Sequence, residues 1–278
     1  MDDGIIYHYC SLDTFQSILR SKKLWLCDLT DSNDDEEMIR TFNCIWDLIK
    51  KRLRTMDLDK DVLEKVIGLI DRHNSIDTSM CIPYGVCFSL DGDSSAMWKE
   101  YGDNTKGVSI GFGRKWFVQN NIANQMPCPN AAQTMSVGIS DVVYDVESLV
   151  SGLSHFFYEM IKMRGVNAWM DNIRYLLKCV SGFTKNDSFR KEEEVRIVYY
   201  PVPGSHDGCI IKPVSNLKTE VTPHYEIDWK KDDSNALCRI VIGHNSTICR
   251  DDLHDMLEGN DVHTQVDIAA SEYTYRIK

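Results

Sequence analysis

Short β-forming segments separated by helical patterns, without regular alternation, are the feature that most constrains the fold. Runs of β-formers occur at 5–9, 24–27, 86–89, 107–112, 136–144, 194–200, 240–242 and 263–268. Apolar residues at helical spacing lie between them, at about 13–19, 39–49, 62–70, 95–101, 146–162 and 167–181. Because a doubly wound parallel sheet requires strands and helices in regular alternation, this order predicts an α+β fold.

The chain is predicted to form a single α+β domain, residues 1–278, with helical insertions at about 33–78 and 146–182. Apolar residues make up 43% of the sequence, which is enough for a sizeable core. Segments 120–135 and 201–235 have little apolar periodicity and are predicted as loop-rich excursions.

Charge and cysteine usage narrow the class of protein. A formal charge of −11 and a pI near 5.2 argue against a broad nucleic-acid surface, although they leave room for a local basic groove. Candidates for such a groove are Lys22, Lys23, Arg114, Lys115, Arg174 and Lys178. The ten cysteines are scattered, without Cys-x-x-Cys pairs or zinc-ligand spacing. With no signal-peptide pattern and no apolar run of about 20 residues, we expect a cytoplasmic protein without membrane contact.

The segment from Glu192 to Tyr200 carries the strongest chemical signal. If the strand extends back through its acidic start, Glu192, Glu194 and Arg196 share one face. Two carboxylates and a guanidinium are costly to place over an apolar core, so this face is either solvated or lines a polar cleft. In a cleft, paired carboxylates can bind sugar hydroxyls and stabilise a developing cation.

Other candidate residues have a structural and a functional interpretation. His8, between two tyrosines on a predicted strand, is either a partly buried histidine with one backbone bond or a donor aimed into a cleft. Trp98 and Tyr101 share a helix face and form either core or the wall of a site. Asn33 and Asp34 are more typical of a helix cap than of a divalent-metal loop, and no metal is expected.

Five segments in order resemble the bacterial domain-of-unknown-function family 2971. They are Tyr7-His8-Tyr9, Ser32 to Glu37, Cys87-Phe88-Ser89 with Met97 to Tyr101, Glu192 to Arg196, and Ser271 to Arg276. The chain has Phe189 where the family pattern has Trp, and Asn-Asp-Asp-Glu-Glu where it has Asn-Asp-Pro-Phe-Glu. The family carries no settled activity.

The opening of the chain is also similar to the ADP-ribosyltransferase superfamily, through its Tyr-His-Tyr strand and the helix and short strand that follow. The resemblance implies a central split β-sheet with inserted helices, and NAD as the substrate. It implies His8 as a contact to NAD, Glu194 as the carboxylate that holds the nicotinamide ribose, and Glu192 as a helper on the acceptor side. Substrate-binding roles fall to Tyr9, Asn33, Asp34, Ser89, Trp98, Tyr101 and Arg196.

The function expected from this resemblance is cleavage of the nicotinamide–ribose bond, with transfer of ADP-ribose to a macromolecule (protein or nucleic acid) or to water. A role as a bacterial toxin or anti-phage defence effector is implied by the resemblance only. One alternative is another N-glycosidic or nucleic-acid-processing enzyme, for example a DNA glycosylase, that uses the same carboxylate cleft. A second alternative is a non-catalytic interaction module in which the charged strand is a solvated surface.

Overall fold

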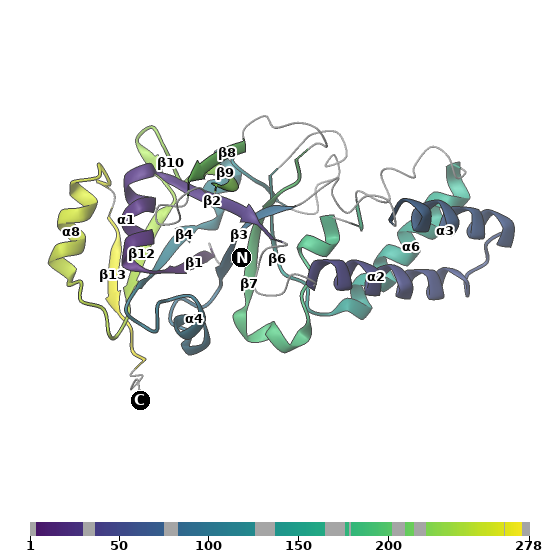
Figure 1. Ribbon diagram of the computed structural model, residues 1–278, viewed down its shortest axis with the longest axis horizontal. Helices are drawn as coiled ribbons and strands as arrows, with labels where there is room; N and C mark the ends of the chain where they lie inside the picture. The colour runs from purple at the N-terminus through teal and green to yellow at the C-terminus, as the bar shows by residue number, and fades with distance from the viewer. Residues whose placement is uncertain are drawn as a thin grey trace.

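The computed structural model describes residues 4–29, 37–74, 83–125, 137–164, 176–177, 179–201, 209–213, 221–263 and 265–273. A large mixed β-sheet forms the body, and three long helices project from one side of it (Figure 1). The prediction of an α+β fold is confirmed at this level. None of the helices in the described part of the chain combines the length and apolarity needed to cross a membrane.

The main sheet has eleven strands. Eight form a continuous path: β13 (Asp267–Ala270), β12 (Leu237–Ile242), β4 (Val108–Gly113), β1 (Ile5–Cys10), β3 (Tyr84–Ser89), β2 (Lys23–Asp28), β9 (Val221–Asp228) and β8 (Cys209–Pro213). Off this path, β7 (Glu194–Tyr199) pairs with β3, β6 (Gly138–Asp141) with β7, and β5 (Asn124–Gln125) with β6. A separate two-stranded ribbon joins β10 (Lys230–Lys231) to β11 (Ser234–Asn235).

The sheet splits at β3. One edge of β3 pairs with β7 along its whole length, from Tyr84 to Ser89. The other edge is shared, because β1 meets β3 only at the pair Tyr7↔Ser89 and β2 meets it at Gly85 and Tyr84. Strands β1 and β2 therefore diverge from the two ends of β3. Two halves of the sheet are joined through this one strand.

The two faces of the sheet are covered differently. Helices α1 (Leu12–Ser21) and α8 (Arg250–Glu258) pack on one face and complete the main apolar core. Alternation along the strands supplies that core with side chains such as Ile6, Phe88 and Val195. On the opposite face lies α4 (Ser95–Glu100), which buries Met97 and Trp98 against Tyr9 and Val241.

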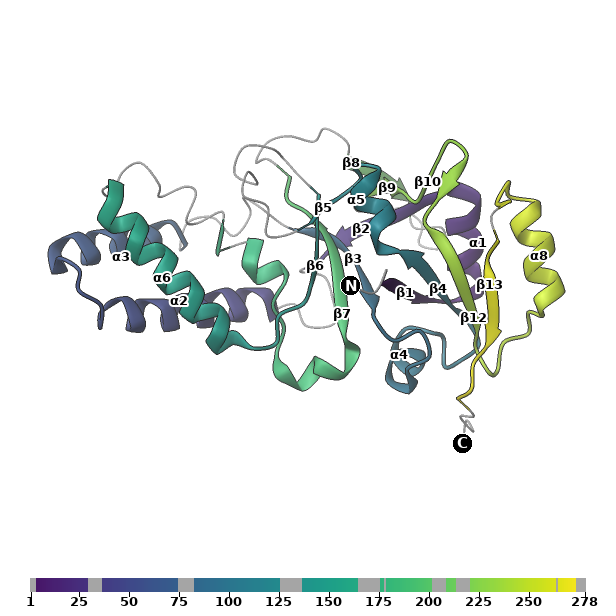
Figure 2. The same cartoon turned by 180° about the vertical axis from the view of Figure 1, so that it is seen from behind.

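The projecting helices are α2 (Glu37–Leu53), α3 (Lys60–Asn74) and α6 (Val146–Arg164), and together we call them the helical arm (Figure 2). The arm has its own apolar cluster, separate from the core of the sheet, in which Ile49, Ile70 and Phe157 are buried. The first two of these helices fall within the insertion predicted at about 33–78, and α6 falls within the one predicted at about 146–182.

The strand predicted at 194–200 is confirmed as β7, which begins at Glu194. It does not extend back to Glu192, because residues Asp187–Glu192 form a 3₁₀-helix, η1, and Glu193 has a left-handed φ of 45°. Two other details differ from the sequence-based prediction. Segment 201–235 contains β8 to β11 rather than only loops. The short helices α5 (Arg114–Gln119) and α8 were not predicted, since their apolar periods span barely two turns.

Candidate functional site

The turn between η1 and β7 has one glutamate on each side of Glu193, namely Glu192 and Glu194. The end of β3 fixes this turn: the Ser89 hydroxyl donates to the carbonyl of Glu192 (2.7 Å), and the amide of Leu90 donates to the carbonyl of Glu193 (2.9 Å). The left-handed backbone at Glu193 reverses the chain direction between the two acids. The side chain of Ser89 therefore positions this turn by binding the backbone of Glu192.

Four charged side chains of alternating sign meet at this turn, and we call them the ion cluster: Glu192, Lys185, Glu194 and Arg196. The Lys185 ammonium donates to Glu192 Oε2 (2.6 Å) and to Glu194 Oε2 (3.3 Å). Arg196 holds Glu194 in a two-point contact, from Nε to Oε1 (2.7 Å) and from Nη2 to Oε2 (3.0 Å). The third described donor of Arg196, Nη1, binds the carbonyl of Gly182 (2.9 Å). The cluster is electrically neutral, with both signs satisfied.

Burial and pairing act in opposite directions on the acid–base behaviour of the cluster. Burial alone would raise the pKa of Glu194, but the charge and hydrogen bonds of Arg196, and then the charge of Lys185, hold that pKa below its ordinary value. Burial likewise disfavours the charged form of Lys185, yet the carboxylate of Glu194 and then that of Glu192 raise its pKa. Both groups are therefore charged at neutral pH.

A free cysteine lies beside the cluster. Cys87 lies on β3, on the strand face that carries Glu194, and its thiol donates a hydrogen bond to the Glu194 carboxylate. Burial of the sulfur atom and the negative charge of Glu194 raise the pKa of Cys87. The thiol is therefore a poor nucleophile, because its thiolate form is disfavoured.

Exposed apolar side chains lie near the ion cluster. Leu90, Tyr101 and Phe189 are 44%, 40% and 38% exposed. The Phe189 ring lies 4.6 Å from the Lys185 ammonium. Burial and then the negative charge of Glu192 raise the pKa of Tyr101 to about 12. Rings at this edge can therefore contact a ligand that reaches the cluster.

Two of the predicted site residues, Tyr9 and Trp98, are structural. Trp98 has no exposed surface, and its indole N–H donates to Asp93 Oδ1 (2.6 Å). Tyr9 packs edge-on against Trp98, donates to the carbonyl of Asp91 (2.7 Å) and accepts from the amide of Ser94 (2.8 Å). Both rings hold α4 against the sheet. The predicted aromatic wall is therefore left to Tyr101.

The structure does not bring His8 to the carboxylates. One ring nitrogen, Nδ1, lies 3.0 Å from the carbonyl oxygen of Cys87, and the ring packs edge-on against Phe88. The cross-strand pairs put Tyr7, Ser89 and Glu194 on one side of the sheet, so the neighbouring His8 points to the other side. Burial lowers the pKa of His8, which favours a neutral ring at the split of the sheet. His8 therefore makes one hydrogen bond to the backbone, in agreement with the structural interpretation of this residue.

Several other candidates either are paired with acids or lie outside the described residues. Asn33 and Asp34 lie outside the described residues. Two members of the suggested basic groove are already paired with acids, Lys23 with Asp228 and Arg114 with Asp141, and two others, Arg174 and Lys178, fall outside the described residues. In the described segments no three His, Cys, Asp or Glu side chains gather in a way that could hold a metal ion.

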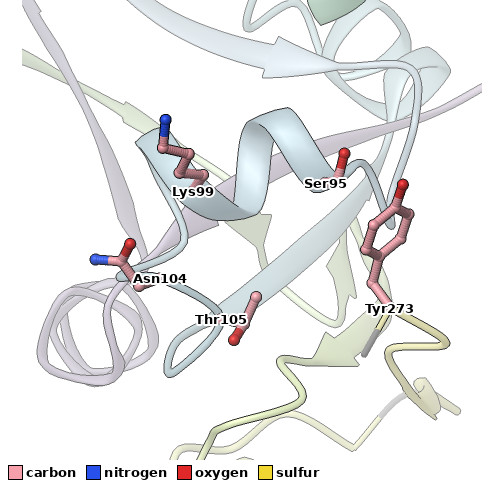
Figure 3. Close-up of a pocket in the computed structure, with 5 residues that line it drawn as sticks. All are labelled: Ser95, Lys99, Asn104, Thr105 and Tyr273. Carbon is pink, nitrogen blue, oxygen red and sulfur yellow. The ribbon is translucent and has the colours of Figure 1, made fainter. Parts of the chain in front are cut away.

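A small hollow elsewhere is lined by Ser95, Lys99, Asn104, Thr105 and Tyr273 (Figure 3). It lies between α4, the turn that follows it and the C-terminal segment. Residues Asp103, Asn104 and Thr105 of that turn all have left-handed backbone, which costs about 1–2 kcal/mol per residue. Asn245 stabilises the turn through a bond from Nδ2 to Thr105 Oγ1 (2.6 Å). The hollow includes no member of the ion cluster.

Comparison with known proteins gives one match. Residues 97–197, from α4 to the middle of β7, match the family model described as a protein of unknown function, DUF2971. The resemblance to this family is therefore confirmed, over a segment that contains Tyr101 and the whole ion cluster. No curated protein and no solved structure matches the chain. The comparisons thus return no ADP-ribosyltransferase.

Proposed function

We propose that this protein is an ADP-ribosyltransferase-like enzyme that cleaves the nicotinamide–ribose bond of NAD and passes ADP-ribose to a macromolecule or to water. The observation that carries the proposal is the ion cluster. A single ammonium, that of Lys185, holds the carboxylates of Glu192 and Glu194, and the exposed rings of Tyr101 and Phe189 lie nearby. Such a pair suits chemistry in which positive charge develops on a sugar.

The bond between ribose C1′ and the nicotinamide ring nitrogen breaks, and its electron pair moves to that nitrogen and neutralises the pyridinium. The sugar becomes oxocarbenium-like and is stabilised by a nearby carboxylate. A lone pair of water or of an acceptor then forms the new bond to C1′, and the acceptor's proton leaves to solvent. Tyr101, 40% exposed beside the cluster, supplies a ring against which nicotinamide can stack.

The split sheet adds support at the level of architecture. The resemblance implies a central split sheet, and β1 and β3 are joined here by a single residue pair. The late strand that was expected to carry the catalytic glutamate is β7, which begins at Glu194 and pairs with β3. An NAD-consuming activity of this kind would suit a toxin or an anti-phage defence effector.

The test is release of nicotinamide from NAD by the purified protein, with water, DNA, RNA or a cell lysate as acceptor. The double variant Glu192→Gln/Glu194→Gln should lose activity by at least the order of 10² to 10³ expected for one catalytic group. Glu193→Gln is the matched control, because this acid is exposed and its side chain lies outside the cluster. If the wild-type protein releases no nicotinamide with any acceptor, the proposal is wrong.

One observation favours a second candidate, a non-catalytic interaction module. Glu194 is only 4% exposed and is bound by Arg196, Lys185 and the thiol of Cys87. A carboxylate so completely paired is also what a purely structural buried ion cluster would show. In that case the double variant would lose stability, and binding of nucleotides would be absent from the wild-type protein.

A further inference from the structure

We propose that Glu192, rather than Glu194, is the carboxylate that contacts the substrate, and that Lys185, Glu194 and Arg196 are positioning residues for it. This inference rests on the proposed function and reverses the roles that the resemblance implies for the two acids. It also assigns a role to Lys185, which no sequence motif singles out.

Glu194 has little capacity left for a ligand. Its Oε1 accepts from Arg196 Nε, and its Oε2 accepts from Arg196 Nη2 and Lys185 Nζ. The Cys87 thiol is a further donor to the same carboxylate. A substrate hydroxyl would have to displace one of these charge-assisted bonds, which are the stronger kind of hydrogen bond.

Glu192, in contrast, keeps an available oxygen. Within the described part of the chain, its Oε2 accepts from Lys185 (2.6 Å), while Oε1 has no hydrogen-bond partner. The Glu192 side chain is 15% exposed against 4% for that of Glu194, so it reaches the surface. It also lies close enough to Tyr101 to affect the ionisation of that phenol. One oxygen is anchored and the other can accept from a ribose hydroxyl.

Lys185, which anchors Glu192, is itself fixed. The backbone of Lys185 is bound at its amide by the carbonyl of Val143 (3.2 Å), next to a β-bridge between Val143 and Thr184. Its ammonium is then held by Glu194, which Arg196 holds in turn. A rigid series of alternating charges therefore ends on Glu192. Such support reduces the rotamer freedom of a reactive side chain.

The experiment compares Glu192→Ala with Glu194→Ala in nicotinamide release, with and without added sodium formate. We expect both variants to lose about 10² to 10³ in rate. Formate should raise the rate of Glu192→Ala at least tenfold, because the cavity that this substitution leaves opens to solvent. It should leave the rate of Glu194→Ala unchanged. Rescue of Glu194→Ala alone, or a wild-type rate for Glu192→Ala, would overturn the assignment.

Lys185 is tested through its conservative variant. Lys185→Met should lower kcat with little change in KM, whereas Lys185→Arg should recover most of the rate, because a guanidinium can also bridge two carboxylates. Equal rates for the Met and Arg variants would overturn the positioning role. An inactive wild-type protein would instead refute the proposed function itself, so the two failures are distinguishable.

Discussion

Arg196 is the residue on which the buried charges of the site depend most. Its guanidinium makes a two-point contact with Glu194, and both side chains are less than a tenth exposed. Arg196→Met would leave this carboxylate with less compensation in a desolvated place. We expect a loss of about 3–5 kcal/mol in the free energy of unfolding. Urea denaturation measures it, and a loss below about 1 kcal/mol would contradict the buried pairing.

The same cluster predicts a pH dependence of stability. The pKa of Glu194 is depressed in the folded protein, so its contribution is present above the unfolded value of about 4.3 and is lost as pH falls through the folded value. The pKa of Lys185 is raised, so its contribution is present below about 10.4 and is lost as pH rises through the folded value.

Glu194→Gln should therefore destabilise the protein at pH 7 and lose this effect progressively in acid. Unfolding curves of the wild-type protein and this variant at several pH values measure the difference, with Glu193→Gln as the control. A difference that stays constant down to the acid limit of folding would argue against an ionised Glu194.

At the scale of single residues, the sequence indicated the two acids as candidates but did not indicate their partner, Lys185. The spacing of Glu192, Glu194 and Arg196 could be recognised because all three lie in one short segment. Lys185 is nine residues from Glu194 and reaches it only through the fold, so no local pattern marks it. The burial of Trp98 and the direction of His8 likewise depend on which elements pack against each strand.

Among the elements, α6 contains one feature that weakens it. Ser154 lies in the middle of this helix with a fully buried side chain, and its hydroxyl has no hydrogen-bond partner in the described residues. A buried, unsatisfied hydroxyl costs about 1–3 kcal/mol, and alanine is the better helix former.

Ser154→Ala should therefore stabilise the protein by about 1 kcal/mol. Thermal unfolding would show a higher Tm than in wild type, while Ser151→Ala, on a partly exposed position of the same helix, should change it less. A lower Tm for Ser154→Ala would mean that this hydroxyl is satisfied in solution.

How well an element was predicted followed its length and periodicity. The helices of the arm, with apolar residues at helical spacing over several turns, were recognised in the sequence. β8 and β9 were missed because their segments mix polar residues and proline with the β-formers. In addition, β9 pairs with β2, which is far along the chain, and β8 pairs only with β9 in the described sheet. The 3₁₀-helix before Glu194 was missed because its acidic end also suits a solvated strand.

At the scale of the whole molecule, the sheet and the helical arm have separate apolar clusters. Because the described apolar side chains of the arm and of the sheet fall into different clusters, we expect the two parts to open independently. Ile49→Ala removes a fully buried side chain of the arm at a cost of about 2–5 kcal/mol.

Hydrogen exchange should then show faster exchange of amides in α2, α3 and α6 with little change in β1, β3 and β4. Phe112→Ala in the sheet core serves as the reciprocal variant, since its effect should fall on the sheet. Uniform acceleration throughout the chain in both variants would show that the molecule unfolds as a single unit.

The α+β class and the sequence positions of the arm helices could be predicted from the order of segments. The split at β3 could not, because it depends on long-range pairing.

The most direct test is a crystal structure of Glu192→Gln, a variant expected to leave NAD uncleaved, with NAD bound. We expect the nicotinamide ribose beside the side chain of residue 192, with a ribose hydroxyl within hydrogen-bond distance and the nicotinamide ring against Tyr101. NAD bound away from the ion cluster, or a cluster covered by protein with no nucleotide bound at saturating NAD, would contradict it.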